Sequence, residues 1–348
     1  MVRKHLYMLS VYSFAHFCVD FACAFLMFRS VSASSNWYVC ILVYNFCAFA
    51  MQMPLGVVAD KLDRNHAFAG AGCLMVGAAF ALMMLPQAEA TALAATVVLG
   101  LGNGMFHIGG GIDVLNISAR RSGALGVFVS PGAFGVYFGT IIGKGAARLD
   151  MALPYLMLVL SISVFMMRRI RGEAHKHNEA FSISAPRGVL VAAALFFVVV
   201  CLRSFTGMSL PFPWKGSGQF ALILVCATVA GKAAGGFLFD KFGPLKTVFF
   251  SLVPAAALFF FPGVPAPGVA AVLLFNMTMP VTLWAMARLF PGAKGFSFGL
   301  LTFGLFLGFL PVYLGVGSAP GWAFAIIALV SMAMLLLGLL RVRAGVES

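Results

Sequence analysis

Two short stretches, far apart in the chain, share one pattern. The first reads Gly56-Val-Val-Ala-Asp60-Lys61-Leu-Asp63-Arg64, and the second reads Gly236-Phe-Leu-Phe-Asp240-Lys241-Phe-Gly243-Pro-Leu-Lys246. In each of these turn motifs an aspartate follows a glycine by four residues, and a lysine follows the aspartate directly. Each motif ends a long apolar segment. A pattern that recurs at equivalent places predicts a chain built from two related halves.

The composition around the turn motifs is that of a membrane protein. Of the 348 residues, 62% are hydrophobic and 9% are charged, and the mean hydropathy is +1.01. Soluble proteins are about 45–50% apolar and about 25% charged. The formal net charge of +13 would suit a nucleic-acid partner, but the basic residues stand between long apolar runs. We therefore predict an all-α polytopic membrane protein that does not bind nucleic acid.

Apolar stretches bounded by charged residues or by Pro and Gly turns predict twelve transmembrane helices. The weakest are 153–168, which is short, and 247–262, which Pro254 interrupts. The predicted spans are 5–28, 36–59, 66–85, 91–117, 123–145, 153–168, 188–208, 217–239, 247–262, 268–287, 295–316 and 321–340.

The basic residues predict the orientation of these spans. Most of the 23 Lys and Arg residues fall in segments on one side, and the segments on the other side hold only Arg29, Lys144, Arg148 and Lys215. The side that is rich in Lys and Arg is cytoplasmic in membrane proteins. We therefore expect both termini in the cytoplasm, in a multi-pass protein of the plasma membrane, here a bacterial inner membrane.

One extended polar stretch lies near the middle of the chain and separates six spans from six. We predict an N-terminal six-helix bundle at 1–170, a cytoplasmic linker at 171–187 and a pseudo-symmetric six-helix bundle at 188–348. His175 and His177 in the linker could bind a metal, but a solvated, charged linker explains them as well. The seven cysteines form no CxxC pair and fall in apolar runs. We expect neither a metal nor a cofactor.

The turn motif resembles the signature loop of the major facilitator superfamily, G-x-x-x-D-R/K-x-G-R/K-R/K, and the resemblance covers the whole chain. Asp63, where the pattern has glycine, and Pro244-Leu245 in the second copy are departures. The resemblance implies that Asp60 and Asp240 bind helix starts in the opposite half, near 294–297 and 122–123 respectively. The gating residues that it implies from the motif are Gly56, Asp60, Arg64, Gly236 and Asp240.

A narrower resemblance lies in three predicted spans. They contain Ala15-His16-Phe17-Cys18-Val19-Asp20, Gly102-Asn103-Gly104-Met105-Phe106-His107 and Val127-Phe128-Val129-Ser130-Pro131-Gly132-Ala133-Phe134-Gly135. These look like the H-F-x-x-D, G-x-G-x-x-F-H and F-x-x-G-G-x-x-G patterns of the fosmidomycin-resistance branch, and Arg203-Ser204 is similar to its seventh-span R-S. Ile108 stands where the branch has proline, and Pro131 where it has glycine.

Ionisable residues inside the spans indicate function, because charge in a bilayer core is costly. His16 and Asp20 lie one helical turn apart, at about 6 Å of helix rise, so their side chains can share a proton. His107 offers a second group that titrates near neutral pH. We predict that Asp20 is the main proton-coupling residue and that His16 and His107 assist it. A neutral buried histidine is the alternative for His16 and for His107.

Arg203 is the arginine within a predicted span, and its planar guanidinium suits carboxylate, phosphate or phosphonate groups. The alternative is a structural pair with Asp20 or with a backbone carbonyl. In the resembled superfamily, spans one, four, seven and ten line a central cavity. The expected substrate site is therefore Arg203, Asn103, His107, Asn276 and Trp284, with Lys232 adding positive charge. Asp113 is expected to act in inner gating with Arg120 or Arg121.

These observations predict a proton-coupled secondary transporter that moves a small organic anion by alternating access. The turn motif and the resemblance to a resistance branch favour efflux by antiport, and uptake by symport is the alternative. A membrane-embedded enzyme acting on lipid phosphates is the alternative from another class, but the sequence has no acidic cluster to hold a metal. The expected partners are the anionic substrate, protons and the lipid bilayer, and we expect a monomer.

Overall fold

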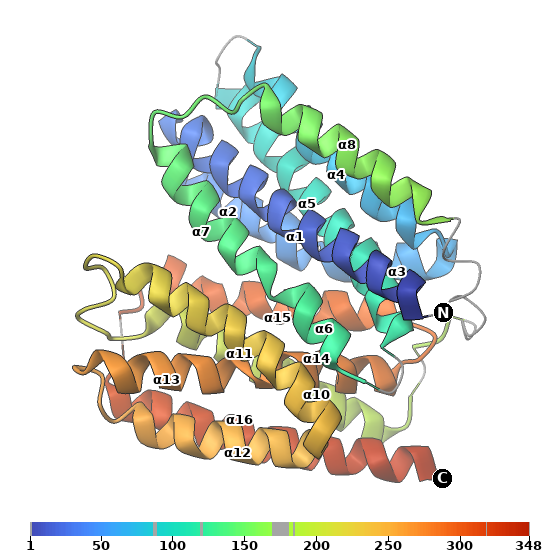
Figure 1. Ribbon diagram of the computed structural model, residues 1–348, viewed down its shortest axis with the longest axis vertical. Coiled ribbons are helices and arrows are strands. Elements are labelled where there is room, and N and C mark those ends of the chain that lie inside the picture. Colours follow the sequence, from blue (N-terminus) through green and yellow to red (C-terminus); the bar gives the residue numbers. More distant parts are fainter. Residues whose placement is uncertain are drawn as a thin grey trace. The chain divides into compact units, whose positions relative to one another are not determined.

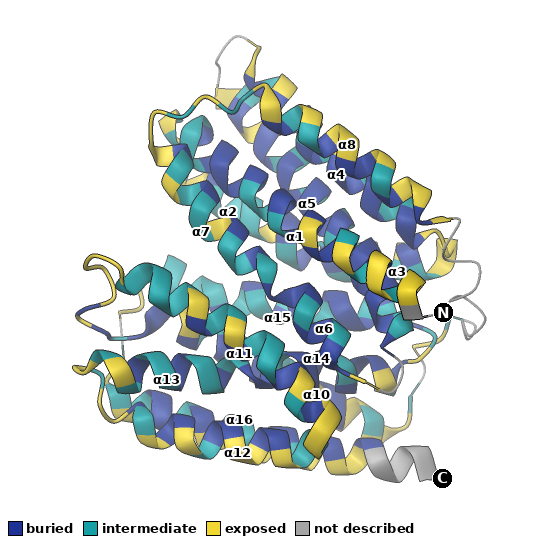
Figure 2. Cartoon of the chain, in the orientation of Figure 1, coloured by how far each residue is buried: buried dark blue, intermediate teal, exposed yellow. Residues whose placement is uncertain are grey.

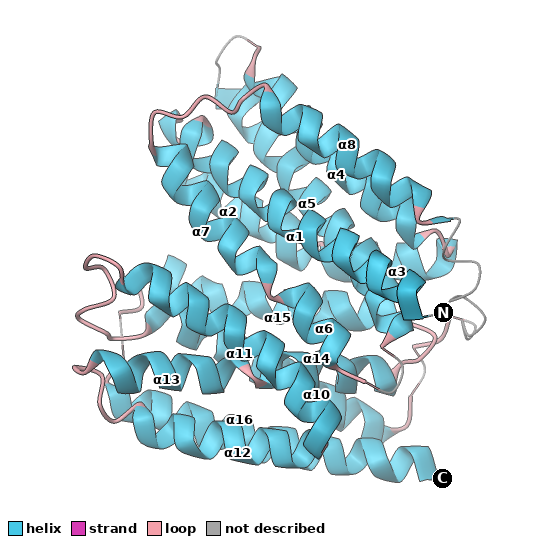
Figure 3. Ribbon diagram, viewed as in Figure 1, coloured by secondary structure: helices cyan, strands magenta, loops and turns pink. Residues whose placement is uncertain are grey.

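The computed structural model describes residues 2–85, 89–118, 121–168, 181–183, 185–317 and 319–347. All regular elements in these ranges are helical, as predicted (Figure 3). A π-helical turn, η2, joins α2 to α3, and a 3₁₀ turn, η1, follows α1. The elements are α1 (Val2–Arg29), η1 (Val31–Ala33), α2 (Trp37–Asn45), η2 (Phe46–Ala50), α3 (Gln52–Leu62), α4 (Asn65–Met83), α5 (Glu89–Ile117), α6 (Gly123–Val129), α7 (Pro131–Lys144), α8 (Ala152–Met166), α10 (Arg187–Ser209), α11 (Phe220–Phe242), α12 (Pro244–Leu258), α13 (Pro265–Asn276), α14 (Thr278–Leu289), α15 (Lys294–Tyr313) and α16 (Gly321–Glu347).

Ten segments of the described chain are long and apolar enough to cross a membrane. Two further apolar helices, α8 and α12, are shorter, and they coincide with the two weakest predicted spans. Exposed residues lie on many helices (Figure 2). Large apolar side chains are among them, for example Tyr155 and Phe250. Such surfaces suit contact with lipid, where apolar side chains need not be buried inside the protein.

Contacts within the chain define two compact units. Unit 1 consists of Met1–Ile117, Pro131–Phe181 and Ala293–Gly299, and unit 2 consists of Ser118–Ser130, Ser182–Gly292 and Leu300–Ser348. Each unit thus includes one short segment from the half of the chain that mainly forms the other unit. These segments are Ala293–Gly299 in unit 1 and Ser118–Ser130 in unit 2. Most of the predicted linker, with His175 and His177, lies outside the described residues, as does Arg120.

In unit 1, α1 packs against α7 and α5, while α4 packs against α5 and α8 (Figure 1). The contact between α1 and α7 is close because α7 presents glycines to it. A Cβ atom at Gly135 or Gly139 would overlap the carbonyl oxygen of Phe17 or Phe21, respectively. Small residues allow helix backbones to approach in this way. The approach of α7 brings its first turn next to the polar residues of α1.

In unit 2, α16 packs against α10 and α12, and α11 packs against α13 and α6 (Figure 1). The predicted span 268–287 is divided at Met277, where α13 ends and α14 begins. The predicted span 123–145 is likewise divided, because Pro131 has no amide hydrogen to continue the helix from α6 into α7.

Both turn motifs contain a residue with positive φ. Asp63 follows α3 with φ 51° and ψ 37°, and Gly243 separates α11 from α12 with φ 82°. Glycine adopts positive φ without steric cost, and aspartate is among the few other residues that visit the left-handed region. Asp63 therefore adopts a positive φ where the resembled pattern has glycine, although its ψ of 37° differs from the 166° of Gly243.

Candidate functional site

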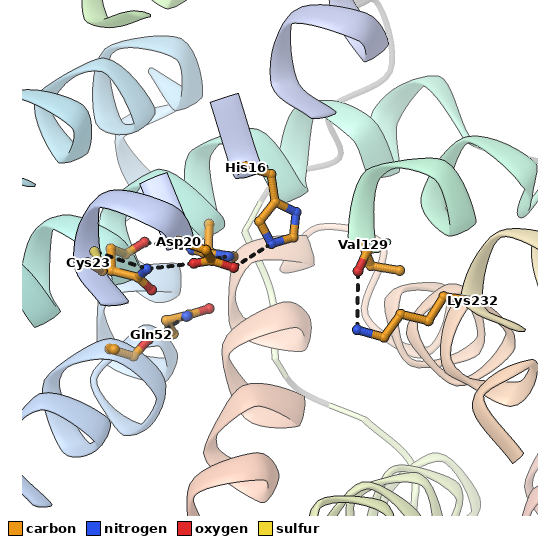
Figure 4. Close-up of polar contacts among 9 residues, drawn as sticks. His16, Asp20, Cys23, Gln52, Val129 and Lys232 are labelled. Carbon is orange, nitrogen blue, oxygen red and sulfur yellow. Dashed lines mark hydrogen bonds and ion pairs between the residues drawn. The ribbon is translucent and has the colours of Figure 1, made fainter. Parts of the chain in front are cut away.

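The carboxylate of Asp20 on α1 lies among three polar side chains of unit 1. His16 Nε2 is 3.2 Å from Asp20 Oδ2, and His107 Nε2 is 3.7 Å from Asp20 Oδ1. Asn103 donates a hydrogen bond of 2.9 Å from Nδ2 to Asp20 Oδ1. Figure 4 shows the His16 ring directed at the Asp20 carboxylate. The structure thus brings His16 and Asp20 of the first predicted span together with Asn103 and His107 of the fourth.

Helix periodicity explains this cluster. His16 and Asp20 are four residues apart on α1, and Asn103 and His107 are four residues apart on α5, so each pair lies on one face of its helix. Because α1 packs against α5, the two faces meet. The rings of His16 and His107 contact edge to face, with centroids 4.5 Å apart.

The His107 ring is oriented by the backbone of its own helix. Its Nδ1 lies 2.8 Å from the carbonyl oxygen of Asn103. A carbonyl oxygen only accepts hydrogen bonds, so this contact assigns a proton to Nδ1. In the neutral ring the lone pair is then on Nε2, the atom that faces Asp20.

Gly132, in the first turn of α7, lies directly against the His16 and Asp20 side chains. A Cβ atom at this position would overlap both His16 Nε2 and Asp20 Oδ2. A larger residue here would displace the His16 or Asp20 side chain, so the glycine leaves room for their contact. The sequence signal was the run of small residues after Pro131, which fits the close approach of α7 to α1.

Arg203 on α10 is buried within unit 2 and contacts neutral hydroxyls. Its Nη2 donates to Thr278 Oγ1 at 2.9 Å and to Thr282 Oγ1 at 3.0 Å. Both hydroxyls donate to backbone carbonyls, so their oxygens accept from the guanidinium. Arg203 Nε is buried without a hydrogen-bond partner, and the whole residue is 8% exposed. The guanidinium thus retains a buried donor.

The other expected substrate residues of unit 2 have separate contacts. Lys232 Nζ donates to the Val129 carbonyl at 3.3 Å (Figure 4). Asn276 donates to the Val272 carbonyl on its own helix. Trp284 Nε1 is buried without a hydrogen-bond partner, and its ring packs between Phe239 and Arg288.

The contacts that the resemblance implies for the turn motifs are confirmed. Asp60 Oδ1 and Oδ2 accept hydrogen bonds from the amides of Gly295 and Phe296, each at 2.8 Å, at the start of α15. Asp240 accepts from the amides of Ser122 and Gly123, at 2.6 and 3.1 Å, at the start of α6. A carboxylate at a helix start satisfies unpaired amides and interacts favourably with the helix dipole.

The glycine of each motif makes room for this contact. Gly56 and Gly236 precede the aspartates by one helical turn, so glycine and carboxylate share a helix face. A Cβ atom at Gly56 would overlap the carbonyl oxygen of Gly295, and one at Gly236 would meet the Ser122 carbonyl oxygen at 2.7 Å. The spacing G-x-x-x-D therefore lets a helix start come close enough for the carboxylate to accept hydrogen bonds from two successive backbone amides.

Asp113 is held inside unit 1. It accepts hydrogen bonds from Tyr12 Oη at 2.7 Å and from Asn65 Nδ2 at 2.9 Å. Arg64, the other predicted gating residue of this region, is exposed and precedes α4 directly. The gating roles of these residues stay predictions.

Sequence reasoning missed Thr278 and Thr282, the hydroxyl partners of Arg203. Their spacing of four residues, within a span that the resemblance places along the central cavity, was the available signal. It also missed Tyr12 and Asn65, whose pairing with Asp113 joins three separate helices.

No family model and no curated protein sequence matches the chain. Solved structures do match it. A variant of the fucose:proton symporter FucP of Escherichia coli is 14% identical, with a TM-score of 0.65, and the match covers 97% of this chain and 99% of that one. FucP in the outward conformation, described as a major facilitator superfamily transporter, is also 14% identical, with a TM-score of 0.63 and coverage of 94% and 98%.

The chain therefore has the fold of these transporter structures, and ten segments of its described residues are long and apolar enough to cross a membrane. The prediction from the turn motif is confirmed at the level of the fold. Membership of the fosmidomycin-resistance branch stays a prediction.

Proposed function

We propose that this protein is a proton-coupled secondary transporter that moves a small organic anion across the membrane by alternating access. The observation that carries the proposal is a nearly buried carboxylate, Asp20, in contact with two histidines inside helices that are apolar enough to span a membrane. A carboxylate inside a membrane span is costly, which makes it a candidate for function, and its two histidine neighbours favour cation binding as that function. FucP, which shares the fold, is itself a proton symporter.

In this proposal, Asp20 takes up and releases the coupled proton. His16 Nε2 and Asn103 Nδ2 orient the carboxylate, and each hydrogen bond stabilises its charged form. His107 is the neighbouring group that can carry the proton onward, because its Nε2 faces the same carboxylate. Loss of the carboxylate alone would then separate substrate movement from proton movement.

Arg203 binds the anionic group of the substrate. Its charge is permanent, its two hydroxyl partners in unit 2 are neutral, and its Nε remains a buried donor. A carboxylate or phosphonate would supply the missing acceptor and the compensating charge. Asn103, His107, Lys232, Asn276 and Trp284 complete the proposed substrate set.

Asp60 stabilises the state in which it binds the start of α15, and Asp240 stabilises the state in which it binds the start of α6. Both pairs of hydrogen bonds break during the conformational change. Gly56, Gly236, Arg64 and Asp113 belong to the same gating apparatus. We propose twelve crossings with both termini in the cytoplasm of a bacterial inner membrane, a monomer, and efflux by antiport. Uptake by symport is the second candidate, favoured by the fold shared with the symporter FucP.

The decisive test is Asp20→Asn in proteoliposomes containing a metal chelator. Wild-type protein should accumulate radiolabelled fosmidomycin, a phosphonate, only when a pH gradient is imposed. Asp20→Asn should lose gradient-driven accumulation and keep exchange of labelled for unlabelled compound, because the amide cannot carry the proton.

The matched control is Asp150→Asn, which removes a carboxylate in the turn before α8. It should transport as wild type does. The proposal would be contradicted if the wild type accumulated the compound equally with and without a pH gradient. It would also be contradicted if Asp20→Asn kept gradient-driven accumulation at the normal rate.

A further inference from the structure

Three side chains of unit 1 have the geometry of a metal-binding group. His16 Nε2, one carboxylate oxygen of Asp20 and His107 Nε2 all lie within 4.8 Å of one another. The two contacts to Asp20 measure 3.2 and 3.7 Å. Ligands at about 2.0–2.1 Å from a tetrahedral zinc ion are separated by roughly 3.3 Å. Small side-chain rotations would therefore bring all three atoms to bonding distance of one ion.

The orientation of His107 favours a cation at this position. Its Nδ1 proton is engaged by the Asn103 carbonyl, so the Nε2 lone pair of the neutral ring faces the Asp20 carboxylate. The lone pair and the carboxylate repel each other, and a cation between them, whether a proton on Nε2 or a metal ion, removes that repulsion. Metal-bound histidines commonly have this arrangement, in which the second ring nitrogen donates to a backbone carbonyl.

Asn103 holds two of the three ligands in place. Its backbone carbonyl fixes the His107 ring, and its side-chain amide donates to Asp20 Oδ1. Asn103 is itself 2% exposed, so its position is set by packing. The ligand side chains are 8% to 13% exposed, which leaves the group close to solvent or to a ligand.

We propose that His16, Asp20 and His107 bind a divalent transition-metal ion of the zinc or cobalt class. Two imidazole nitrogens and one carboxylate oxygen are ligands that such borderline ions prefer, whereas Mg²⁺ and Ca²⁺ prefer oxygen alone. Three protein ligands leave one coordination position for water or for an anionic group. The metal would occupy the atoms assigned above to the proton, so the two cations would compete.

This inference does not depend on transport, because metal binding is measured on the isolated protein. The probe is Co²⁺, titrated into full-length protein in detergent that carries no histidine tag. Wild type should bind one Co²⁺ per chain with visible d–d absorption. His107→Gln and Asp20→Asn should each weaken binding by at least about tenfold.

Two controls test three of the four other histidines. The double variant His175→Ala with His177→Ala removes the linker pair, and His5→Gln removes a histidine near the start of α1. Both should bind Co²⁺ as wild type does. Loss of binding in the linker variant, or binding that survives His107→Gln and Asp20→Asn, would overturn the proposal, as would a wild type without Co²⁺ absorption.

A measurement on the wild type alone tests the proposal even if the variants fail to fold. X-ray absorption of the Zn²⁺-loaded protein should show nitrogen and oxygen ligands with imidazole scattering. A sulfur shell would assign the metal to cysteines and overturn the proposal. Transport assays with chelator remain a separate test, so either proposal can fail without the other.

Discussion

Arg203 is the residue whose surroundings depart most from what its charge requires. A buried guanidinium usually contacts a carboxylate or several carbonyls, since desolvation of an unpaired charge is costly. Within unit 2 the described contacts of Arg203 are two threonine hydroxyls, and its Nε has no partner. The anionic substrate proposed above would supply an acceptor for this donor and a compensating charge.

Substitutions of Arg203 test this use. Arg203→Lys keeps the charge but loses the planar pair of donors, and Arg203→Ala loses both, so fosmidomycin binding should weaken in that order. For Arg203→Ala the loss should reach roughly 2–5 kcal/mol, the range for removal of a desolvated charge partner. Binding titration and melting temperature are measured on the same detergent-solubilised samples.

Arg187→Ala, at the exposed start of the same helix, is the matched control and should bind normally. Near-normal affinity in Arg203→Ala together with a large loss of stability would make Arg203 a structural residue. Recovery of stability by the double change Asp20→Asn with Arg203→Ala would identify Asp20 as its partner.

At the scale of elements, each turn motif works through a glycine and a carboxylate on one helix face. Gly56 and Gly236 leave room for the start of a second helix, and Asp60 and Asp240 accept hydrogen bonds from the first backbone amides of that helix. The same four-residue spacing places His16 with Asp20 and Asn103 with His107. One rule of helix geometry thus explains both the turn-motif contacts and the polar cluster.

Asp60→Asn should loosen the start of α15. The asparagine side chain has one acceptor oxygen, so it can accept a hydrogen bond from only one of the two backbone amides. It also loses the attraction to the helix dipole, at a cost of about 1 kcal/mol. Amide hydrogen exchange in residues 294–297 should then accelerate about fivefold, if exchange follows local opening. Peptide-resolved mass spectrometry measures this rate, and Asp240→Asn should have the same effect at residues 122–125.

Asp63→Asn is the internal control, because Asp63 lies in the same turn and Asn also tolerates its left-handed backbone. Unchanged exchange at both helix starts in Asp60→Asn and Asp240→Asn would mean that these hydrogen bonds do not hold the gate.

At the scale of the whole molecule, the duplicated motif explains why each compact unit includes a segment from elsewhere in the chain. Ala293–Gly299 belongs to unit 1, where Asp60 binds it, and Ser118–Ser130 belongs to unit 2, where Asp240 binds its middle. A chain of two unrelated domains would have no reason to exchange segments twice at equivalent places.

Topology across the membrane is tested by cysteine labelling. Ser182→Cys and Ser217→Cys are exposed positions on either side of α10 and are introduced into a chain in which the exposed Cys226 is serine. In intact cells an impermeant maleimide should label Ser217→Cys alone, and opened membranes should allow both to react. Labelling of both from one side would show that α10 does not cross the membrane.

Much of this protein follows from local sequence alone. Apolar runs longer than a bilayer requires, broken by charges, determine where helices form, because an unpaired backbone cannot remain in lipid. The four-residue spacings determine which polar residues share a helix face, and the G-x-x-x-D spacing, read with the family resemblance, indicated the partners of Asp60 and Asp240. Pro131, which divides the span 123–145, is also visible in the sequence, whereas Pro254 does not interrupt its helix as expected, because α12 continues through it.

Only the tertiary structure decided which faces meet. The sequence leaves free how each helix is rotated about its axis and which helices are neighbours, so it could not indicate that Gly132 borders His16 and Asp20. For the same reason it could not assign Thr278 and Thr282 to Arg203. It also could not show that the Asn103 carbonyl turns the His107 lone pair toward a carboxylate. These contacts join residues far apart in the chain, and packing between helices alone sets their distances.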